Sequence, residues 1–307
     1  MASEIPESAS LESSPAESTS SETSALESAP SEDALVENLV SKAGVAKSGR
    51  PRILAVANQK GGVGKTTTTV NLATALAAIK KRVLIVDLDP QGNASTGLGV
   101  DRNTTTQTTY HCLVGDTPAR DIIVETMVPG LYVAPSSVDL SGAELELIDV
   151  AKREYRLKAA LDSVGRDFDY ILIDCPPALG LLTLNAFCAA DSVLVPLQCE
   201  FYALEGLSHL VKTVNRIKRA FNPGLEIQGV VLTMYDRRNN LSDMVAADVR
   251  DHFGDKVYET VIPRNVRVSE APSFGKPVLL YDWRCAGSQA YIHLASEVLK
   301  QERRMMA

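Results

Sequence analysis

The chain lacks the features of membrane, secreted and iron–sulfur proteins. No apolar run approaches the roughly 20 residues that a membrane-spanning helix needs. The N-terminus has no basic region followed by an apolar one, so we expect no secretory signal. The five cysteines are scattered and form no C-x-x-C pair, which argues against an iron–sulfur protein and favours reduced thiols. These absences predict a soluble, cytoplasmic protein that does not bind membranes.

Negative charge is concentrated at the front of the chain. The 307 residues carry a formal net charge of −7. Residues 1–50 contain nine acidic and three basic residues, a balance of −6, which leaves −1 for residues 51–307. A near-neutral core can still carry a local basic patch, so the total charge does not exclude binding to nucleic acid.

Residues 1–50 are predicted to be a disordered acidic extension. Residues 1–30 are mostly Ser, Glu, Pro, Ala and Thr, and such a segment cannot offset its ordering entropy. Residues 31–44, SEDALVENLVSKAG, have a Ser N-cap, an apolar face and a terminal Gly, so they could form a short helix. That helix could dock on a polar or cytoskeletal hub, or form transiently without a partner. The acidic extension could instead compete with DNA for a basic patch.

A glycine-rich loop stands between a predicted strand and a predicted helix. Residues 60–67 read KGGVGKTT, residues 53–57 form an apolar run, and residues 66–79 have apolar side chains at helical spacing. Glycines let the backbone approach a ligand closely, and the N–H groups at a helix N-terminus favour an anion. Lys65 would contact the β- and γ-phosphates of a nucleotide, and the Thr66 hydroxyl would coordinate Mg²⁺.

The loop departs from the ordinary phosphate-binding pattern at its start. The general motif G-x-x-x-x-G-K-[ST] requires Gly at position 59, where this chain has Gln59. An additional lysine, Lys60, follows it.

Further apolar runs alternate with helical patterns along the chain. Predicted strands cover residues 82–86, 131–134, 170–173, 193–195, 227–234 and 257–262, and predicted helices cover residues 143–164, 203–221, 241–253 and 287–303. Residues 101–130 look irregular. This alternation predicts an α/β fold for residues 51–307: one domain with a doubly wound, mostly parallel sheet flanked by helices.

Two aspartates follow predicted strands. Asp89 lies in VDLDPQGN and Asp174 in ILIDCPP. A single Asp after a strand is often a turn or capping residue, but ligands of open α/β sheets bind beyond the carboxyl ends of the strands. We therefore expect both to face the loop, with Asp174 holding Mg²⁺ through water and Asp89 orienting the attacking water.

Longer motifs resemble those of a known family. The strings NQKGGVGKTTT, VDLDPQGNASTGLG, DYILIDCPPALGLLTLNA, ALEGL and VIPRNVRVSEAPSFGKPV are similar, in order, to the ParA (Soj-type) partition ATPases of the deviant Walker A family, across residues 52–303. The resemblance implies a P-loop ATPase that forms an ATP-bound homodimer and binds non-specific double-stranded DNA. It also implies that a ParB-type centromere-binding protein stimulates weak ATP hydrolysis and releases the dimer, which drives segregation of the chromosome origin near the nucleoid.

The resemblance also implies roles for individual residues. Catalysis would involve Lys60, reaching across the dimer, together with Lys65 and Asp89; magnesium would be held by Thr66, Asp89 and Asp174. The implied nucleotide-binding residues are Lys60, Gly61, Gly62, Val63, Gly64, Lys65, Thr66, Thr67, Met234, Pro263 and Asn265. The implied DNA-binding residues are Arg238, Arg267 and Lys276, although exposed basic residues of this kind are more often simply solvated.

Two alternative functions share most of these motifs. A MinD-like, membrane-associated relative would need bulky apolar residues after the C-terminal basic cluster, and residues 290–307 instead have a stripe typical of a helix packed on its own domain. A ParA-like factor that positions another cargo, such as a plasmid or a protein cluster, is harder to separate by sequence. Residues 1–50 are too short and polar for a helix-turn-helix domain, which favours chromosomal partition.

Overall fold

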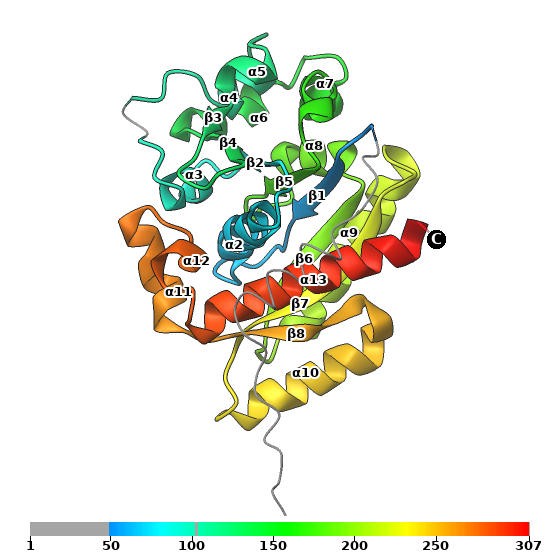
Figure 1. The fold of residues 1–307 in the computed structure, drawn as a ribbon. Coiled ribbons are helices and arrows are strands. Elements are labelled where there is room, and N and C mark those ends of the chain that lie inside the picture. The colour runs from blue at the N-terminus through cyan, green and yellow to red at the C-terminus, as the bar shows by residue number, and fades with distance from the viewer. Residues whose placement is uncertain (1–48, 102–103, 307) are drawn as a thin grey trace, which may run out of the picture.

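The computed structural model describes residues 49–101 and 104–306. Their eight strands form one sheet in the order β3-β4-β2-β5-β1-β6-β7-β8 (Figure 1). Every neighbouring pair is parallel except β3 and β4, which are antiparallel at one edge. The predicted doubly wound, mostly parallel sheet is therefore confirmed. The predictions for residues 1–48, including the short helix at 31–44 and its hub, lie outside the described residues.

Most strands are short, and the central ones, β1, β2, β5 and β6, are largely buried. The strand bounds are β1 (Arg52–Val56), β2 (Val83–Asp87), β3 (Val124–Glu125), β4 (Leu131–Ala134), β5 (Tyr170–Asp174), β6 (Ser192–Gln198), β7 (Glu226–Tyr235) and β8 (Val257–Pro263). The α-helices are α2 (Lys65–Ala78), α3 (Asn93–Gly97), α4 (Thr109–Leu113), α5 (Ala119–Ile122), α6 (Ala143–Glu146), α7 (Arg156–Asp162), α8 (Leu181–Ala189), α9 (Ala203–Ala220), α10 (Asn240–Phe253), α11 (Val266–Glu270), α12 (Val278–Tyr281) and α13 (Ala286–Met306). The 3₁₀ helices are η1 (Val138–Ser141), η2 (Arg153–Tyr155), η3 (Gly165–Asp167), η4 (Gly254–Lys256) and η5 (Ala271–Phe274).

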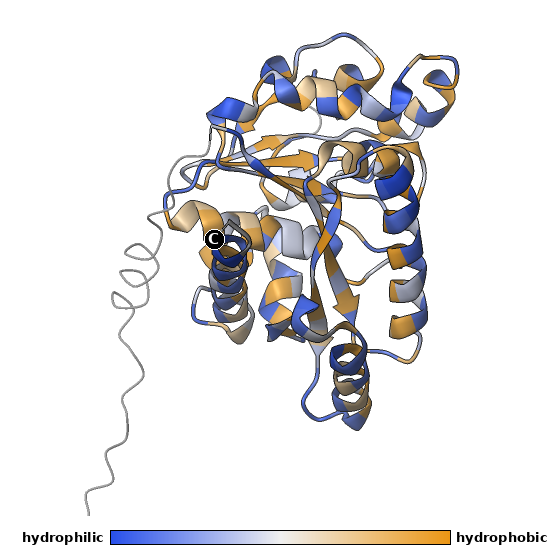
Figure 2. Cartoon of the chain, turned by 90° about the vertical axis from the view of Figure 1, so that its right-hand side faces the viewer, coloured by the Kyte–Doolittle hydropathy of each residue, from blue (hydrophilic) through white to orange (hydrophobic). Residues whose placement is uncertain are grey.

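The sheet separates two hydrophobic cores. Side chains alternate between the faces of a strand, so Ile53 and Ala55 of β1 join the core beneath α8, α9 and α10. Leu54 and Val56 join the other core, beneath α2 and α13. Figure 2 shows the mostly orange strands between the helices that cover them. Burial on both faces explains why these strands are continuous apolar runs rather than alternating ones.

The C-terminal helix α13 packs on the domain. Its predicted apolar stripe is buried on the sheet beside α2: Tyr291, Leu294, Ala295, Val298 and Leu299 are each at most 5% exposed. The prediction of a helix docked on its own domain is confirmed. Among the described residues, we find no helix with both the length and the apolarity needed to cross a membrane.

Two predicted segments were wrong. Residues 143–164 do not form one long helix; α6 ends at Glu146, and Lys152 adopts a left-handed conformation (φ 56°) before η2 and α7 begin. Leu145 and Ile148, which an amphipathic helix would bury, are 73% and 54% exposed. Residues 101–130 are not irregular throughout, because they contain α4, α5 and β3. The helices α3, α8, α11 and α12 were also not predicted.

Truncation of a buried leucine on α13 should destabilise the fold. Leu294 is fully buried, so Leu294→Ala would leave a cavity and lower the free energy of unfolding by about 2–5 kcal/mol. Leu280→Ala makes the same chemical change at a side chain that is 49% exposed and should cost much less. Urea unfolding measures both variants; equal losses would contradict the role of α13 as a core helix.

Candidate active site

The loop between β1 and α2 leaves the helix N-terminus open. Gly62 and Gly64 have φ angles of +73° and +86°, which favour glycine. Gly64 caps α2 without any side-chain hydrogen bond to the helix. Uncapped N–H groups and the positive end of the helix dipole together make an anion site. The loop itself is anchored, because Thr233 donates a hydrogen bond to the Val63 carbonyl (2.8 Å).

Lys65 points back into this loop. Its ammonium donates to the Lys60 carbonyl oxygen at 3.0 Å, and the residue is only 7% exposed. Burial lowers the pKa of Lys65 below its ordinary 10.5, and the nearby carboxylates of Asp174 and Asp89 oppose that shift. The lysine charge is thus held at the mouth of the anion site, with acidic groups around it.

Carboxylates gather at the neighbouring ends of β2 and β5. Asp87 and Asp174 are paired residues in the two adjacent strands, and both are fully buried. Burial raises the pKa of both carboxyl groups above the ordinary 3.8. Repulsion from the Asp87 carboxylate raises the pKa of Asp174 further. Asp89 lies two residues beyond β2 and is 7% exposed. The two aspartates expected to face the loop are therefore at the same edge of the sheet as Lys65.

Asp174 carries an uncompensated oxygen. Thr69 donates to its Oδ1 at 3.2 Å, while its buried Oδ2 has no hydrogen-bond partner among the described residues. A buried carboxylate oxygen without a donor is costly unless a cation or solvent reaches it. Within residues 49–101 and 104–306, no three His, Cys, Asp or Glu side chains form a cluster that could hold a metal by themselves. The donors therefore fit a hard cation that takes its other ligands from phosphate and water.

Lys60 lies on the exposed side of the loop. Its ammonium forms an ion pair with Glu200, which follows β6, and its side chain is 46% exposed. It therefore does not point at the anion site of its own chain. On the other side of the loop, Thr66 and Thr67 line a cavity of about 270 Å³. Lys276 lines the same cavity, which lies between α2, α3 and the segment leading to α12.

The residues predicted to surround adenine lie at adjacent strand ends. Met234 is at the end of β7 and has a positive φ of 50°. Pro263 ends β8 and is paired with Tyr235 of β7. Asn265 caps α11, where its side chain accepts a hydrogen bond from the Arg267 N–H (2.9 Å). The structure brings these elements together at the carboxyl edge of the sheet that also carries the loop.

The three predicted DNA-binding residues have different surroundings. Arg238 is 87% exposed at its side chain and pairs with Asp236 at 2.8 Å. Arg267 pairs with Glu270 at 3.0 Å and with Asp282 at 3.5 Å. Both arginines extend from loops or short helices that follow β7 and β8, whereas Lys276 is beside Thr66 and Thr67. The three do not form a single cluster with unpaired side chains.

Asp87 is absent from the predicted site although the sequence contained a signal for it. It ends an apolar run just as Asp174 does, two residues before Asp89. Its carboxylate accepts hydrogen bonds from the Ser95 backbone and hydroxyl, at 2.9 and 2.7 Å. Ser95 could not be found by motif, because its partner depends on how α3 folds back onto β2.

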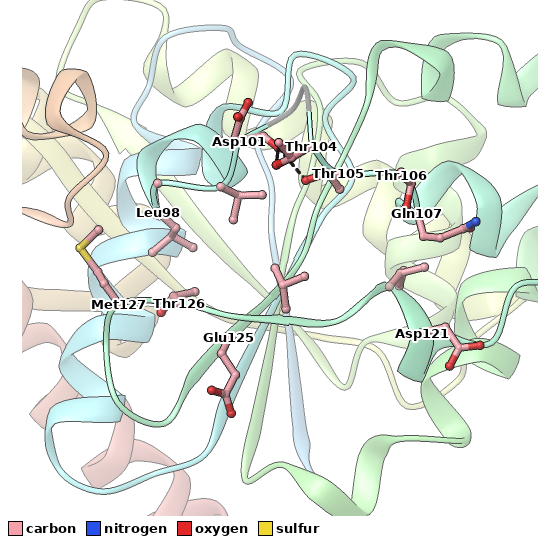
Figure 3. A pocket seen from close by; sticks show the side chains of 14 residues that line it. Leu98, Asp101, Thr104, Thr105, Thr106, Gln107, Asp121, Glu125, Thr126 and Met127 are labelled. Atoms are coloured by element: carbon pink, nitrogen blue, oxygen red, sulfur yellow. Dashed lines mark hydrogen bonds between the residues drawn. The ribbon is translucent and has the colours of Figure 1, made fainter.

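A second hollow lies away from the loop. Figure 3 shows the side chains around a volume of about 510 Å³ that is lined by residues 98–101, 104–107, 121–122 and 124–127, including Asp101, Glu125 and Met127. No residue of the predicted site lines it. The anion site and the carboxylates are therefore separate from this hollow.

Comparison with known proteins decides the family. Residues 51–227 match a family model described as an AAA domain. The chromosome partitioning protein ParA of Caulobacter vibrioides is 63% identical over 254 residues, which cover 82% of this chain and 95% of that protein. The chain belongs to the ParA family. This ParA-family protein is also 56% identical over 247 residues to the sporulation initiation inhibitor protein Soj of Bacillus subtilis, covering 80% of this chain and 98% of Soj.

Solved structures agree with the fold of this ParA-family protein. The cell division ATPase MinD of Pyrococcus furiosus superposes with a TM-score of 0.68 at 32% identity, covering 81% of this chain and 98% of that one. A Mycobacterium smegmatis structure described as cobyrinic acid a,c-diamide synthase with bound ADP and magnesium gives a TM-score of 0.73 at 39% identity, covering 82% and 96%. The predicted resemblance to the ParA/MinD ATPases is confirmed.

Removal of the Asp174 charge should flatten the pH dependence of stability. Because the pKa of Asp174 is higher in the folded than in the unfolded chain, the folded chain binds more protons between these values. The stability of the nucleotide-free protein should therefore fall as pH rises from about 4 to about 8, and it should level off above that. The side chain of Asp174→Asn cannot ionise, so the stability of this variant should decrease less with pH than that of the wild type. Tm at each pH measures the difference.

The control is an aspartate at the opposite end of β5. Asp169 accepts a hydrogen bond from the Arg82 backbone at 2.8 Å and precedes the strand. Asp169→Asn should keep the wild-type pH profile even if it lowers Tm throughout. Parallel profiles for wild type and Asp174→Asn would show that Asp174 carries no buried charge.

Proposed function

We propose that this protein is a chromosome-partitioning ATPase that hydrolyses ATP to ADP and phosphate. The observation that carries the proposal is the open N-terminus of α2, with Lys65 beside it and the unpartnered Asp174 oxygen opposite. This arrangement offers positive groups to a polyphosphate and an oxygen ligand to its cation, as a P-loop ATPase requires. The ParA and Soj relatives support the partition role.

The loop residues would bind the triphosphate of ATP. Backbone N–H groups from Gly61 to Gly64 and the first turn of α2 would contact the phosphates, and Lys65 would neutralise the β- and γ-phosphates. Thr67 would contact the α-phosphate, and Met234, Pro263 and Asn265 would enclose the adenine.

Thr66 and Asp174 would hold the magnesium ion that accompanies ATP. The Thr66 hydroxyl would be a direct ligand, and Asp174, with Asp89 nearby, would act through water. Magnesium supplies charge neutralisation between the β- and γ-phosphates when it is bound.

Asp89 and Lys60 would complete the chemistry. Asp89 would orient the water that attacks the γ-phosphate, and hydrolysis needs no covalent intermediate on the chain. Lys60 is at the exposed edge of the loop and paired with Glu200, so it would act on the nucleotide of a second copy after leaving that ion pair. A cation supplied across an interface would stabilise transition-state charge much as an arginine finger does. Intrinsic turnover would therefore be slow until the dimer and its partner assemble.

The ATP dimer would bind non-specific double-stranded DNA through Arg238, Arg267 and Lys276. Hydrogen bonds to phosphate oxygens provide affinity without sequence information, which suits a protein that uses the whole nucleoid. A ParB-type protein would stimulate hydrolysis and release the dimer from DNA. Cycles of binding and release would then segregate the chromosome origin.

Charge reversal at Arg238 should weaken ATP-dependent DNA binding. Its guanidinium is 87% exposed and can reach a phosphate by leaving Asp236. Arg238→Glu should reduce affinity for a non-specific duplex, and the slope of log K against log salt should fall by about 1 for each DNA phosphate that is no longer neutralised. Fluorescence anisotropy with ATP, ADP or no nucleotide, across a salt series, measures both quantities.

A matched control is available on α5. Arg120 is 73% exposed and pairs with Asp167 at 3.7 Å, close to the start of β5 and therefore at the opposite edge of the sheet. Arg120→Glu makes the same charge change and should leave ATP-dependent binding intact. Equal affinity losses in the two variants would mean that only the total charge matters and that Arg238 does not contact DNA. Equal binding with ATP, with ADP and without nucleotide would contradict a dimer that binds DNA only in the ATP state.

A further inference from the structure

Two buried serines, Ser95 and Ser136, hold the segment that carries Asp89 in place through hydrogen bonds. Ser95 of α3 is fully buried, and both its backbone N–H and its hydroxyl donate to Oδ2 of Asp87, at 2.9 and 2.7 Å. Oδ1 of Asp87 accepts a third hydrogen bond from the Asp89 backbone N–H at 3.2 Å. The end of β2 is thereby tied to α3, and Asp89 lies in the short segment between them.

Ser136, which follows a different strand, also hydrogen-bonds to this segment. It lies two residues after β4, is 2% exposed, and donates its backbone N–H to the Ser95 hydroxyl oxygen at 3.1 Å. Its own hydroxyl donates to the Asp89 carbonyl oxygen at 2.7 Å. The Asp89 carbonyl also accepts from the Gly92 N–H at 2.8 Å. The main chain of Asp89 is thus held on both its N–H and its carbonyl side.

These hydrogen bonds leave little freedom for the Asp89 backbone. Both serine hydroxyls donate to protein oxygens and lie away from water, so moving the segment would leave buried polar groups unpaired. The hydrogen bonds converge on Asp87, which ends β2, and on the main chain of Asp89 two residues later. Such support matters where a catalytic group must keep its place within a fraction of an ångström.

We propose that Ser95 and Ser136 are positioning residues that fix Asp89 for ATP hydrolysis. Neither serine touches the nucleotide in this role; Ser95 acts through Asp87, and Ser136 acts through the Asp89 carbonyl. The inference rests on the proposed ATPase function and deepens it. It adds Ser136, which follows β4, to a site built at the carboxyl ends of β1, β2 and β5. Loss of either hydroxyl slows hydrolysis without weakening nucleotide binding.

The test compares three serine-to-alanine variants of the full chain. Ser95→Ala and Ser136→Ala each remove one hydroxyl from the support of Asp89. Ser192→Ala removes a hydroxyl that is equally buried but lies at the start of β6, where it contacts Arg52 and Gln228 at 3.0 and 2.9 Å. ATP turnover with Mg²⁺ and DNA gives kcat and KM, binding of a fluorescent ATP analogue gives Kd, and thermal unfolding gives Tm.

The expected result separates positioning from stability. Ser95→Ala and Ser136→Ala should lower kcat at least about tenfold while KM and Kd change little, since misplacement of a catalytic group affects the chemical step. All three variants lose a buried hydroxyl and should lower Tm to a similar degree. Ser192→Ala should nevertheless keep the wild-type kcat. Wild-type kcat in both site variants would overturn the inference, as would an equal loss of kcat in Ser192→Ala.

Failure of the proposed function would look different. A wild-type chain that binds ATP but does not hydrolyse it, even with DNA and a ParB-type protein, would overturn the ATPase proposal and this inference with it. A wild-type chain that turns over normally, beside site variants with unchanged kcat, would overturn the positioning role alone.

Discussion

The burial of two facing carboxylates is the constraint on which this structure depends. Asp87 and Asp174 are paired across β2 and β5 and have no access to solvent. Asp87 is compensated by three hydrogen-bond donors from its own segment. In the part of the chain that the structure describes, Asp174 accepts from Thr69 and keeps one oxygen without a partner. The hydrogen bonds that Asp174 receives therefore offset only part of its desolvation cost, and its pKa stays above the ordinary value. A cation at this position would offset the rest of that cost, so ligand binding and stability are linked.

At the same edge of the sheet, the loop before α2 has the opposite requirement, because its N–H groups and Lys65 are positive. The N-terminus of α2 has no side-chain cap, and Lys65 is desolvated there, so this part of the site attracts an anion. An anion site beside a cation site matches a magnesium nucleotide in both charges. Lys60, in contrast, is turned outward into its ion pair with Glu200. Under the proposed function, one chain would therefore supply most of the catalytic site, and Lys60 of a second copy would complete it.

The sequence predicted the parts of this site that depend on local pattern. Apolar runs located the strands, and in a parallel sheet the residues that follow adjacent strands share one edge; Asp89, Asp174 and the glycine loop could therefore be placed together. Ser95 and Ser136 could not, because their hydrogen bonds depend on the fold of α3 and on the order of β2 and β4. The predicted helix at 143–164 failed because helical spacing alone does not show that Leu145 and Ile148 have nothing to pack against.

Under the proposed function, each catalytic site takes Asp89 from one chain and Lys60 from the other. Mixing Lys60→Ala with Asp89→Ala tests it, since each variant alone should be inactive. In a mixed dimer, the nucleotide bound by the Lys60→Ala chain meets an intact Asp89 and the partner's Lys60, so equal mixing should restore about a quarter of the wild-type ATPase rate. No recovery in a mixture that forms dimers would contradict the claim, because each site would then need both residues from one chain.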